Sequence, residues 1–428
     1  MEWATERVGL LLGCSKRERP KDVFLPKLRF GDANGHISNT NVFEHSGKVY
    51  VITENYIPQE LNISTLETYD DWDVNDAWNR PFTSHPKKDL VTGELVIMGF
   101  DATKPFYDIF VHSADGTKLS HKADLKFDRG IFSHEIGVTQ KYNVIMDCAI
   151  TADFNRLLSG GLFVKYENEG RSRIGVIPRY GNANSAKWFE VKRHCSLHPI
   201  NRFEDGHEVV VRQCRSFQPI LLGPNCGQDR FEWFTRGFTF ENLTEKNPYN
   251  LTQDGFLFTH SYEWRLNMET GEVKERNLSG TDFSIDFPVI DEKYTGLKHK
   301  YGFTQVIDST TSSIAGLPKY GGLAKLHLDE PQAPPKPTEL VEVKYHRLAE
   351  NNFFSGTVFV AKHRACEEDD GWLVSFVHNE ETNKTRVHII DAKKLESGTV
   401  AKIALPQKVP YGFHGTFVPI LYIHIYYF

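Results

Sequence analysis

Cysteine is scarce in this 428-residue chain, and no two cysteines form a CxxC pair. The six are scattered along the chain, at Cys14, Cys148, Cys195, Cys214, Cys226 and Cys366. Without paired spacing or a secretory signal peptide, nothing in the sequence indicates a disulfide framework. We therefore expect free thiols and a reducing compartment.

Long apolar runs, basic runs and nucleotide-binding motifs are also missing. No apolar run reaches the roughly 18 residues of a membrane-spanning helix, so none is expected. The net charge is −6, and there is no basic–aromatic motif, which argues against nucleic acid as a partner. The chain has neither a P-loop nor a GxGxxG motif after a strand, so no nucleotide site is expected.

The two ends of the chain carry no clear targeting signal. The start, MEWATERVGLLLGCSKRERPKD, has a short apolar segment behind acidic residues, which is typical of neither a secretory signal nor a transit peptide. The end, FVPILYIHIYYF, is an apolar run of 12 residues. It is compatible with a last strand, with an edge that dips into a membrane, or with a tail from an altered reading of the gene.

Helical periodicity is nearly absent, and short β-type runs recur from end to end. Runs such as KVYVITE, GELVIMGF and HEVVVRQC are rich in Val, Ile or aromatic residues and are bounded by turn-forming residues. Hairpins are expected at Asp115–Gly116 and Thr270–Gly271, because glycine supplies the positive φ of a tight turn. The pattern predicts an all-β fold, either a β-propeller with about four strands per blade or two stacked β domains.

A proline-rich stretch, LDEPQAPPKPTEL, occupies residues 328–340. Such a composition is compatible with a linker between domains or with a long surface loop between blades. Strands are expected on both sides of it, which favours the loop.

Histidine is plentiful, with 18 residues, and four of them share one context. Each lies at the edge of a strand-like run beside proline, glycine or a small residue: His85 in TSHPKKDL, His134 in IFSHEIGV, His198 in CSLHPINRF and His414 in VPYGFHGTF. They are separated by 49, 64 and 216 positions, far more than in a local HExxH or CxxC site. A shared metal site would require convergence from different blades, which spacing alone does not establish.

In their order along the chain, these segments resemble the signature segments of the carotenoid cleavage oxygenase family. The resemblance runs from about residue 30 to 417, and further matching stretches are NTNVFEHSGKVYVITENYIPQELNISTLET, RIGVIPRYG, DFPVIDEKYTGLKHKYGFTQV and EEDDGWLVSFVH. The runs HSYEWRLNMETGEVKERNLSGTDFSIDFP and LPKYGGLAKL are most similar to plant members, in particular to the zaxinone synthase-like branch. The resemblance implies a seven-bladed β-propeller with Fe(II) on its central axis, held by His85, His134, His198 and His414.

The family supports its iron-binding histidines with three glutamates, which the resemblance places at positions 54, 286 and 356. Glu54 matches the first, and Asp286 stands at the second with a side chain one methylene shorter. Gly356 stands at the third, so no carboxylate is present there, and nothing in the sequence shows that the nearby Glu350 substitutes. Three other histidines match no ligand segment and are expected to be surface or packing residues: His194, His207 and His260.

The implied activity is that of a non-haem Fe(II) dioxygenase that cleaves a conjugated C=C bond of a carotenoid or apocarotenoid with O2 into two carbonyl products. Two alternatives stay open. One is a catalytically impaired propeller that still binds iron or apocarotenoid. The other is an enzyme for a different conjugated alkene, such as a stilbene cleavage enzyme or a retinoid-type isomerase. The implied partners are the hydrophobic substrate and O2, with peripheral membrane contact; the implied location is the plastid, with the cytosol as alternative.

The first 30 residues match the family poorly. Family members carry a longer segment before the region of NTNVFEH, so the resemblance covers residues 31–428 with the N-terminal blade region missing. We therefore expect a propeller that is incomplete at its N-terminus, with sheet edges left open.

Overall fold

The structure is a computed structural model that describes residues 38–419. The gaps within this range are residues 39, 55, 76, 79, 81, 102–105, 154, 157–163, 168, 217–258, 280–283, 309–310, 313–317, 330–340 and 413. Three features predicted from the sequence therefore lie wholly or mostly outside the described residues. They are the poorly matching segment 1–30, the proline-rich stretch and the apolar C-terminal run.

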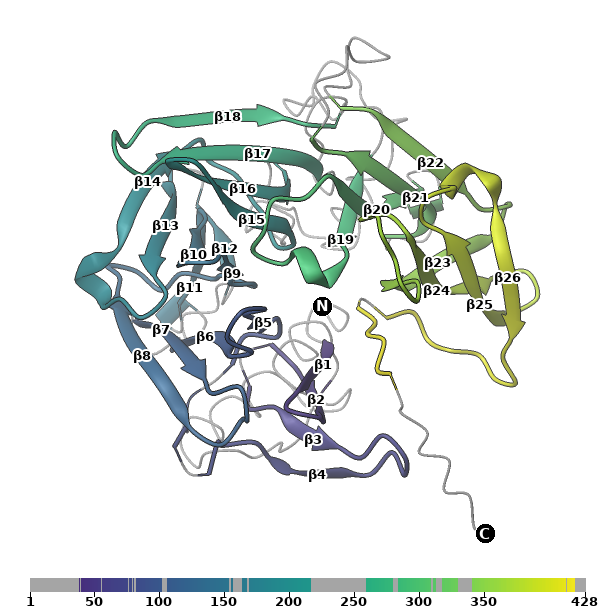
Figure 1. The fold of residues 1–428 in the computed structure, drawn as a ribbon, viewed down its shortest axis with the longest axis horizontal. Coiled ribbons are helices and arrows are strands. Elements are labelled where there is room, and N and C mark those ends of the chain that lie inside the picture. The colour runs from purple at the N-terminus through teal and green to yellow at the C-terminus, as the bar shows by residue number, and fades with distance from the viewer. Residues whose placement is uncertain are drawn as a thin grey trace.

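Almost all regular structure in the described residues is antiparallel β-sheet, arranged as six four-stranded blades around a centre (Figure 1). The first three blades are β1 (Asn41–His45), β2 (Lys48–Ile52), β3 (Gln59–Leu61) and β4 (Thr68–Asp71); β5 (Lys87–Lys88), β6 (Leu95–Asp101), β7 (Phe106–His112) and β8 (Leu119–Lys126); and β9 (Gly137–Val138), β10 (Tyr142–Asp147), β13 (Ser172–Pro178) and β14 (Lys187–Val191). A two-stranded sheet, β11 (Ile150–Ala152) and β12 (Val164–Tyr166), accompanies the third blade.

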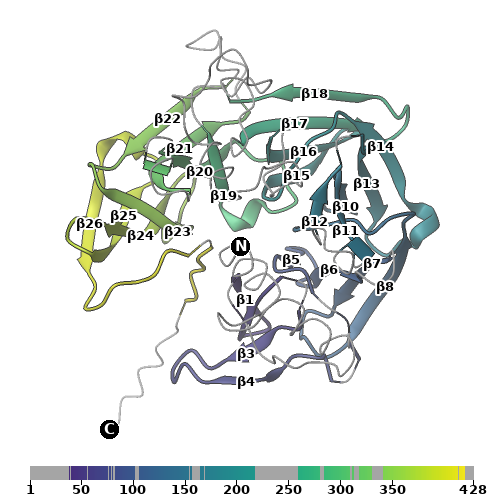
Figure 2. The same ribbon diagram turned by 180° about the vertical axis from the view of Figure 1, so that it is seen from behind.

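The last three blades continue around the ring, which Figure 2 shows from behind. They are β15 (Pro199–Asp205), β16 (Glu208–Arg215), β17 (His260–Asn267) and β18 (Val273–Asn277); β19 (Ile285–Val289), β20 (Tyr301–Ile307), β21 (Tyr320–His327) and β22 (Val343–Arg347); and β23 (Asn352–Ala361), β24 (Gly371–Asn379), β25 (Lys384–Asp391) and β26 (Thr399–Ala404). The fifth and sixth blades join through one pair, Tyr320 with Phe354.

Within the part of the chain that the structure describes, helical structure is limited to short segments. The named helices are the 3-10 turns η1 (Ala183–Ser185), η3 (Glu292–Tyr294) and η4 (Leu395–Ser397). Within the described residues, no helix has the length and hydropathy required to cross a bilayer.

The hydrophobic core is divided among the contacts between neighbouring blades. Five clusters of buried side chains fill the five successive interfaces, from the first and second blades to the fifth and sixth. In the cluster between the third and fourth blades, for example, Val144 and Ile174 meet Val211 and Trp264. Each blade is thus stabilised by its neighbours, as expected for a repeat architecture in which one sheet cannot bury both faces alone.

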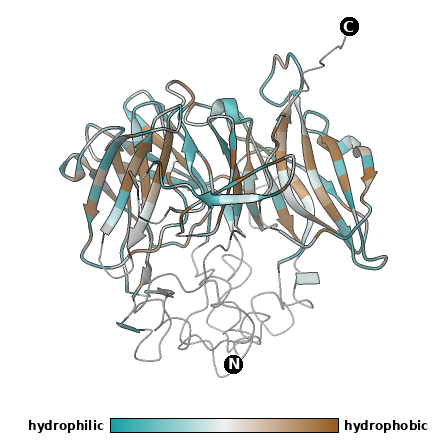
Figure 3. Ribbon diagram, turned by 90° about the horizontal axis from the view of Figure 1, so that it is seen from below, coloured by the Kyte–Doolittle hydropathy of each residue, from teal (hydrophilic) through white to brown (hydrophobic). Residues whose placement is uncertain are grey.

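The outermost strand of a blade is less buried than its middle strands. In the fourth blade, seven of the eight residues of β16 are buried, whereas none of the five residues of the outer strand β18 is. Hydrophobic and hydrophilic residues alternate in patches along the strands, as the edge-on view in Figure 3 shows. The difference in burial follows from sheets that stack face to face, because the middle strands are covered by the adjacent blades on both faces.

The predicted all-β propeller is confirmed, and so are both hairpins. Gly116 in the β7–β8 turn has φ +68°, and Gly271 in the β17–β18 turn has φ +81°. Of the seven predicted blades, six are described. The region of the predicted incomplete blade falls on undescribed residues.

The prediction for the proline-rich stretch was wrong in one respect. Its flanking strands, β21 and β22, pair with each other antiparallel, from Gly322 with Arg347 to Leu326 with Val343. The stretch therefore connects two strands of one blade and not two successive blades. Sequence composition does not distinguish these cases, because both connections run over the surface.

Candidate metal centre

Three of the four predicted histidines occupy equivalent places in successive blades. His85, His134 and His198 each come one to three residues before the innermost strand of the second, third and fourth blades, β5, β9 and β15. These strands lie nearest the centre of the ring in Figure 1. His414 follows β26 on the segment that returns toward the centre, so four distant segments contribute one imidazole each.

The four imidazoles converge. One ring nitrogen of each lies within 4.8 Å of the corresponding nitrogen of every other, and the Nε2 atoms of His85 and His134 are 3.0 Å apart. The ring centroids of His85 and His414 are 4.3 Å apart, and those of His198 and His414 are 5.0 Å apart. Facing lone pairs at such distances require a shared proton or a cation between them.

Glu54 supports His134 from behind. The Glu54 Oε2 atom accepts a hydrogen bond from His134 Nδ1 at 2.6 Å and a second one from the Ser84 hydroxyl at 2.7 Å. Ser84 directly precedes His85, so one carboxylate oxygen connects two of the histidine segments. Because Nδ1 carries the proton in this contact, Nε2 is left free to face the cluster.

Asp286 supports His198 in the same way. Its Oδ1 atom accepts a hydrogen bond from His198 Nδ1 at 2.9 Å and another from the backbone N–H of Phe287 at 2.8 Å. The pairing of β19 with β20 shifts register between Asp286 and Val289, and Phe287 has φ +51°. Such a bulge redirects side chains beside functional sites, and it brings the shorter aspartate within reach of the histidine.

His85 has an amide in place of a carboxylate. The Asn41 Nδ2 atom lies 3.3 Å from His85 Nδ1 and donates a hydrogen bond to the Ser84 carbonyl at 2.8 Å. A parallel bridge between His85 and Glu135 fixes the backbone of this segment next to that of His134. His85 is therefore held by its backbone neighbours and by a neutral side chain.

His414 lacks a polar support for its ring among the described residues. Gly356 lies directly against its backbone: a Cβ atom at Gly356 would be 3.4 Å from the His414 carbonyl oxygen. Glu350 is exposed in the turn before β23 and makes no described contact with the cluster. The Phe287 ring instead lies beside His414 and His198, with centroid distances of 5.1 and 4.6 Å.

The electrostatics of the cluster follow from these partners. Burial and the three other imidazoles lower the pKa of His85 well below its usual value, and burial with His198 and His134 does the same for His414. Burial also opposes charge on His134, but the Glu54 carboxylate outweighs it and raises the pKa of His134. Two rings are thus held in the neutral form that a metal ion requires, and one is held in place by a carboxylate.

The other histidines named from the sequence lie outside the cluster. His194 is buried, with Nδ1 2.9 Å from the Lys192 carbonyl and Nε2 3.4 Å from the Cys148 sulfur. His207 is exposed and 2.8 Å from Glu269, and His260 is a buried residue of β17. These placements agree with surface or packing roles.

Sequence reasoning missed Asn41, Ser84 and Phe287. Asn41 and Ser84 lie inside the segments that carry the resemblance, but no residue pattern indicated that they contact the histidines. For Phe287 a signal was present, since it lies between Asp286 and a proline in an otherwise regular strand, and proline disturbs strand pairing.

The donor set fits a transition-metal ion. Metal–imidazole bonds are about 2.0–2.1 Å long, so ligand nitrogens around one ion lie about 3–4 Å apart, close to the spread of the cluster. Imidazole suits iron, copper, zinc and nickel, and four imidazoles leave coordination positions open. The fold and the donors together define a class: a β-propeller with a four-imidazole centre at the meeting point of its blades.

Comparison with known proteins identifies the family. Residues 9–419 match the family described as Retinal pigment epithelial membrane protein, and the chain belongs to this family. The Carotenoid 9,10(9',10')-cleavage dioxygenase of Crocus sativus is 32% identical over 391 residues, covering 89% of this chain and 66% of the relative. A Carotenoid 9,10(9',10')-cleavage dioxygenase of Pisum sativum is 31% identical over 404 residues, covering 92% and 69%. The chain thus spans about two thirds of the length of these relatives.

Solved structures show the same fold. The lignostilbene dioxygenase of Pseudomonas brassicacearum matches with a TM-score of 0.75 at 22% identity, covering 93% of this chain and 82% of that one. Cobalt-substituted Synechocystis ACO matches with a TM-score of 0.73 at 18% identity, covering 90% and 75%. The predicted family and fold class are confirmed.

Proposed function

We propose that this protein is a non-haem Fe(II) dioxygenase that cleaves a conjugated C=C bond of a carotenoid or apocarotenoid with O2 to give two carbonyl products. The observation that carries the proposal is the convergence of His85, His134, His198 and His414 from four distant segments. Its support is the dioxygenase activity named for the curated relatives. Residence in the plastid is part of the proposal, because several relatives are named as chloroplastic.

The residues of this chain would hold and orient the metal. The four imidazoles would supply neutral nitrogen donors, and Glu54 and Asp286 would fix the tautomers of His134 and His198 through their Nδ1 protons. A bound Fe(II) ion would supply open coordination positions at which O2 can react with an electron-rich double bond. The two carboxylates would also offset its charge without occupying those positions.

Phe287 would shape the side from which a substrate approaches. Its ring lies beside two of the four histidines and 5.4 Å from the ring of Tyr320, a partly buried residue whose pKa is raised well above its usual value by desolvation of the hydroxyl. Both rings present aromatic surface and no charge. Such a wall suits an apolar polyene and excludes water from the imidazoles.

The test is iron content and cleavage activity of the purified full chain. We expect about one iron per chain, and conversion of an apocarotenal into two carbonyl fragments in air but not under nitrogen, measured by mass spectrometry. His198→Ala should lose both iron and products. His207→Ala, an exposed histidine outside the cluster, is the matched control and should lose neither. A folded wild-type chain that binds no iron would overturn the proposal.

One observation favours the impaired alternative over full activity. Among the described residues no carboxylate contacts the His414 ring, and Gly356, where the resemblance places a family glutamate, lies against the His414 backbone. If the chain binds iron and apocarotenoid but forms no carbonyl fragments, the function is binding and not cleavage.

A further inference from the structure

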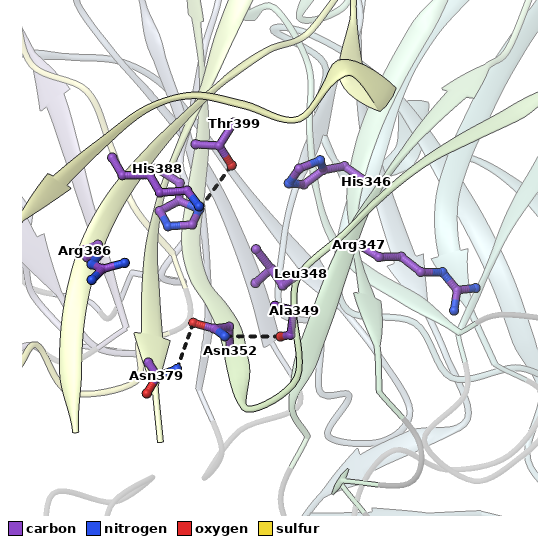
Figure 4. Close-up of a pocket in the computed structure, with 10 residues that line it drawn as sticks. His346, Arg347, Leu348, Ala349, Asn352, Asn379, Arg386, His388 and Thr399 are labelled. Atoms are coloured by element: carbon purple, nitrogen blue, oxygen red, sulfur yellow. Dashed lines mark hydrogen bonds between the residues drawn. The ribbon is translucent and has the colours of Figure 1, made fainter. Parts of the chain in front are cut away.

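A cavity outside the histidine cluster has its own chemistry. It has a volume of about 390 Å³ and lies between β22, the turn that follows it, the adjoining ends of β23 and β24, and the strands β25 and β26 (Figure 4). We call it the outer pocket and define it by His346, Asn352, Arg386, His388 and Lys402, which are among its lining residues. None of the four clustered histidines belongs to it.

Strand register explains why cations gather in the outer pocket. Arg386 and His388 are two residues apart on β25, so their side chains leave the same face of the blade. His388 pairs directly with Lys402 on β26, so that side chain leaves the same face as well. Further along this face, Ile390 is buried in the cluster between the fifth and sixth blades. The outer pocket is therefore the polar end of an otherwise apolar blade interface.

The charge of the outer pocket is of one sign. No aspartate or glutamate lines it, although the chain as a whole carries a net charge of −6. Neither Arg386 nor Lys402 forms an ion pair with a carboxylate of the described residues. Burial together with Lys402, His346 and Arg386 lowers the pKa of His388 to about 4, so the ring is neutral at pH 7. Arg386 and Lys402 thus concentrate positive charge at the pocket.

His346 adds an unused hydrogen-bond acceptor. Its ring hydrogen-bonds the backbone of Leu395, while its Nε2 atom is buried and has no partner. Burial lowers the pKa of His346, so this nitrogen carries a lone pair. The rings of His346 and His388 lie on either side of the pocket in Figure 4, and His388 Nδ1 is 3.4 Å from the Thr399 hydroxyl.

One wall of the outer pocket is already ordered. The Asn352 side chain donates to the Glu350 carbonyl at 2.8 Å and accepts from Asn379 at 3.2 Å. These contacts hold the turn before β23 in place, and Figure 4 shows the one between Asn352 and Asn379 as a dashed line. A ligand entering the pocket therefore meets a preformed surface, which keeps the entropic cost of binding low.

We propose that the outer pocket binds a phosphate group, with Arg386 and Lys402 contacting its anionic oxygens and its P–OH group donating a hydrogen bond to His346 Nε2. Hydrogen phosphate offers both kinds of group, whereas sulfate at neutral pH has no O–H to donate. The volume lies within the range of about 300–1,000 Å³ typical of small-ligand sites and leaves room for the rest of a phosphomonoester. The shared chemistry is the monoprotonated phosphate group, carried by inorganic phosphate or by a phosphomonoester below its second pKa of about 6, from a soluble metabolite or from a lipid headgroup.

Isothermal titration of the full chain with inorganic phosphate tests the proposal. We expect saturable binding of about one phosphate per chain, at least tenfold tighter than binding of sulfate. Arg386→Ala and Lys402→Ala should each weaken phosphate binding about tenfold or more, as expected for loss of one charge-assisted contact. Lys394→Ala removes the same charge from an exposed position between β25 and β26 outside the pocket, and should leave binding unchanged.

The controls and a vesicle assay supply the outcomes that would overturn or refine the proposal. Absence of saturable binding, or an equal loss in Lys394→Ala, would overturn the proposal, and so would equal affinity for phosphate and sulfate. Phosphatidylcholine vesicles that contain phosphatidic acid distinguish the sources. Sedimentation that requires Arg386 would assign the site to a lipid headgroup, whereas phosphate binding without sedimentation would assign it to a soluble ligand. Iron content is unaffected in all cases, so failure here is distinct from failure of the proposed function.

Discussion

The four clustered histidines fall into two pairs that differ in what lies behind them. His134 and His198 each donate Nδ1–H to a carboxylate, of Glu54 and of Asp286 respectively. His85 has the amide of Asn41 at 3.3 Å, and the His414 ring has no polar partner among the described residues. The first pair is therefore oriented by charge-assisted hydrogen bonds, and the second pair by backbone placement and packing.

This difference shows that one centre can combine histidines oriented by strong hydrogen bonds with histidines oriented by packing. Charge-assisted hydrogen bonds are roughly twice as strong as neutral ones, so the first pair should dominate metal affinity. The second pair contributes rings that are already neutral, since the pKa values of His85 and His414 are both well below the usual value. Substitutions at these residues and changes of pH test the difference between the two pairs.

The largest effect is expected from removing the carboxylates. Glu54→Gln and Asp286→Asn keep the shape of each side chain but remove its charge. Each should weaken iron binding about 10–100-fold, as is typical for the residues that orient metal ligands. The measurement is competition of the purified variants against a coloured chelator. Glu350→Gln, an exposed carboxylate near the site in sequence, is the control; an equal loss in that variant would contradict the assignment.

The pH dependence of metal binding should come from His134. The pKa of His134 is raised, so its proton competes with the metal, whereas His85 and His414 have no proton to lose at neutral pH. Below the raised pKa, affinity should fall about tenfold per pH unit, because one proton is displaced. Titrations from about pH 6 to about pH 8 measure the slope. In Glu54→Gln, the fall in iron affinity should begin at a lower pH. An unchanged pH profile would contradict the role of Glu54 in raising the pKa of His134.

Lowering the pH has opposite effects at His134: it weakens metal binding, but in the metal-free chain it increases the contribution of His134 to the stability of the fold. A histidine with a raised folded-state pKa stabilises the fold fully below its unfolded value of about 6.5. That stabilisation disappears as the pH rises through the folded-state pKa. His85 and His414 have lowered pKa values, so their neutral rings disfavour protonation in the folded state. The fold therefore loses their contribution to stability as the pH falls below about 6.5. Thermal unfolding of wild type and Glu54→Gln across this range separates the two contributions.

A smaller effect is expected at Asn41. Asn41→Ala removes a neutral contact that orients the His85 ring and is worth about 1 kcal/mol, so iron affinity should change by no more than about fivefold. The same chelator competition measures it. Asn62→Ala, in an exposed turn of the first blade, is the matched control. A loss as large as that of Glu54→Gln would show that the amide is as important as a carboxylate, and would remove the distinction between the pairs.

The smallest effect is expected at Gly356, which tests the support of His414. Gly356 has φ +62°, so Gly356→Ala should destabilise the fold by about 1 kcal/mol. Gly47→Ala, at φ +78° with nothing within 4 Å of the added Cβ, reports the conformational cost alone. Urea unfolding compares the two variants. Because the added Cβ of Gly356→Ala also touches the His414 carbonyl, only this variant should additionally lower iron affinity.

Much of the fold was predictable because its signals are local. The hairpins at Gly116 and Gly271 follow from turn residues between β-type runs, and the strands follow from Val, Ile and aromatic content. The connection through the proline-rich stretch was misplaced because which strand pairs with which is decided by long-range contacts. For β21 and β22, the pairing extends over five residue pairs that no local pattern reveals.

The candidate site was predictable only in part. His85, His134, His198 and His414, together with Glu54 and Asp286, were found through resemblance to a family, and the structure brings the histidines together and puts a carboxylate behind two of them. Asn41 and Phe287 were not found, because their contacts depend on how one blade faces the next. The role of these residues around iron stays a prediction.

By itself, the amino-acid sequence determined the strands, the turns and the identity of the chemically active side chains, since these depend on neighbours a few positions away. Only the tertiary structure decided that four imidazoles meet, that His414 rests against Gly356, and that cations of β25 and β26 line one pocket. These outcomes depend on five blade interfaces that close through burial of apolar surface. Residues as far apart as 85 and 414 become neighbours only when the successive interfaces have formed.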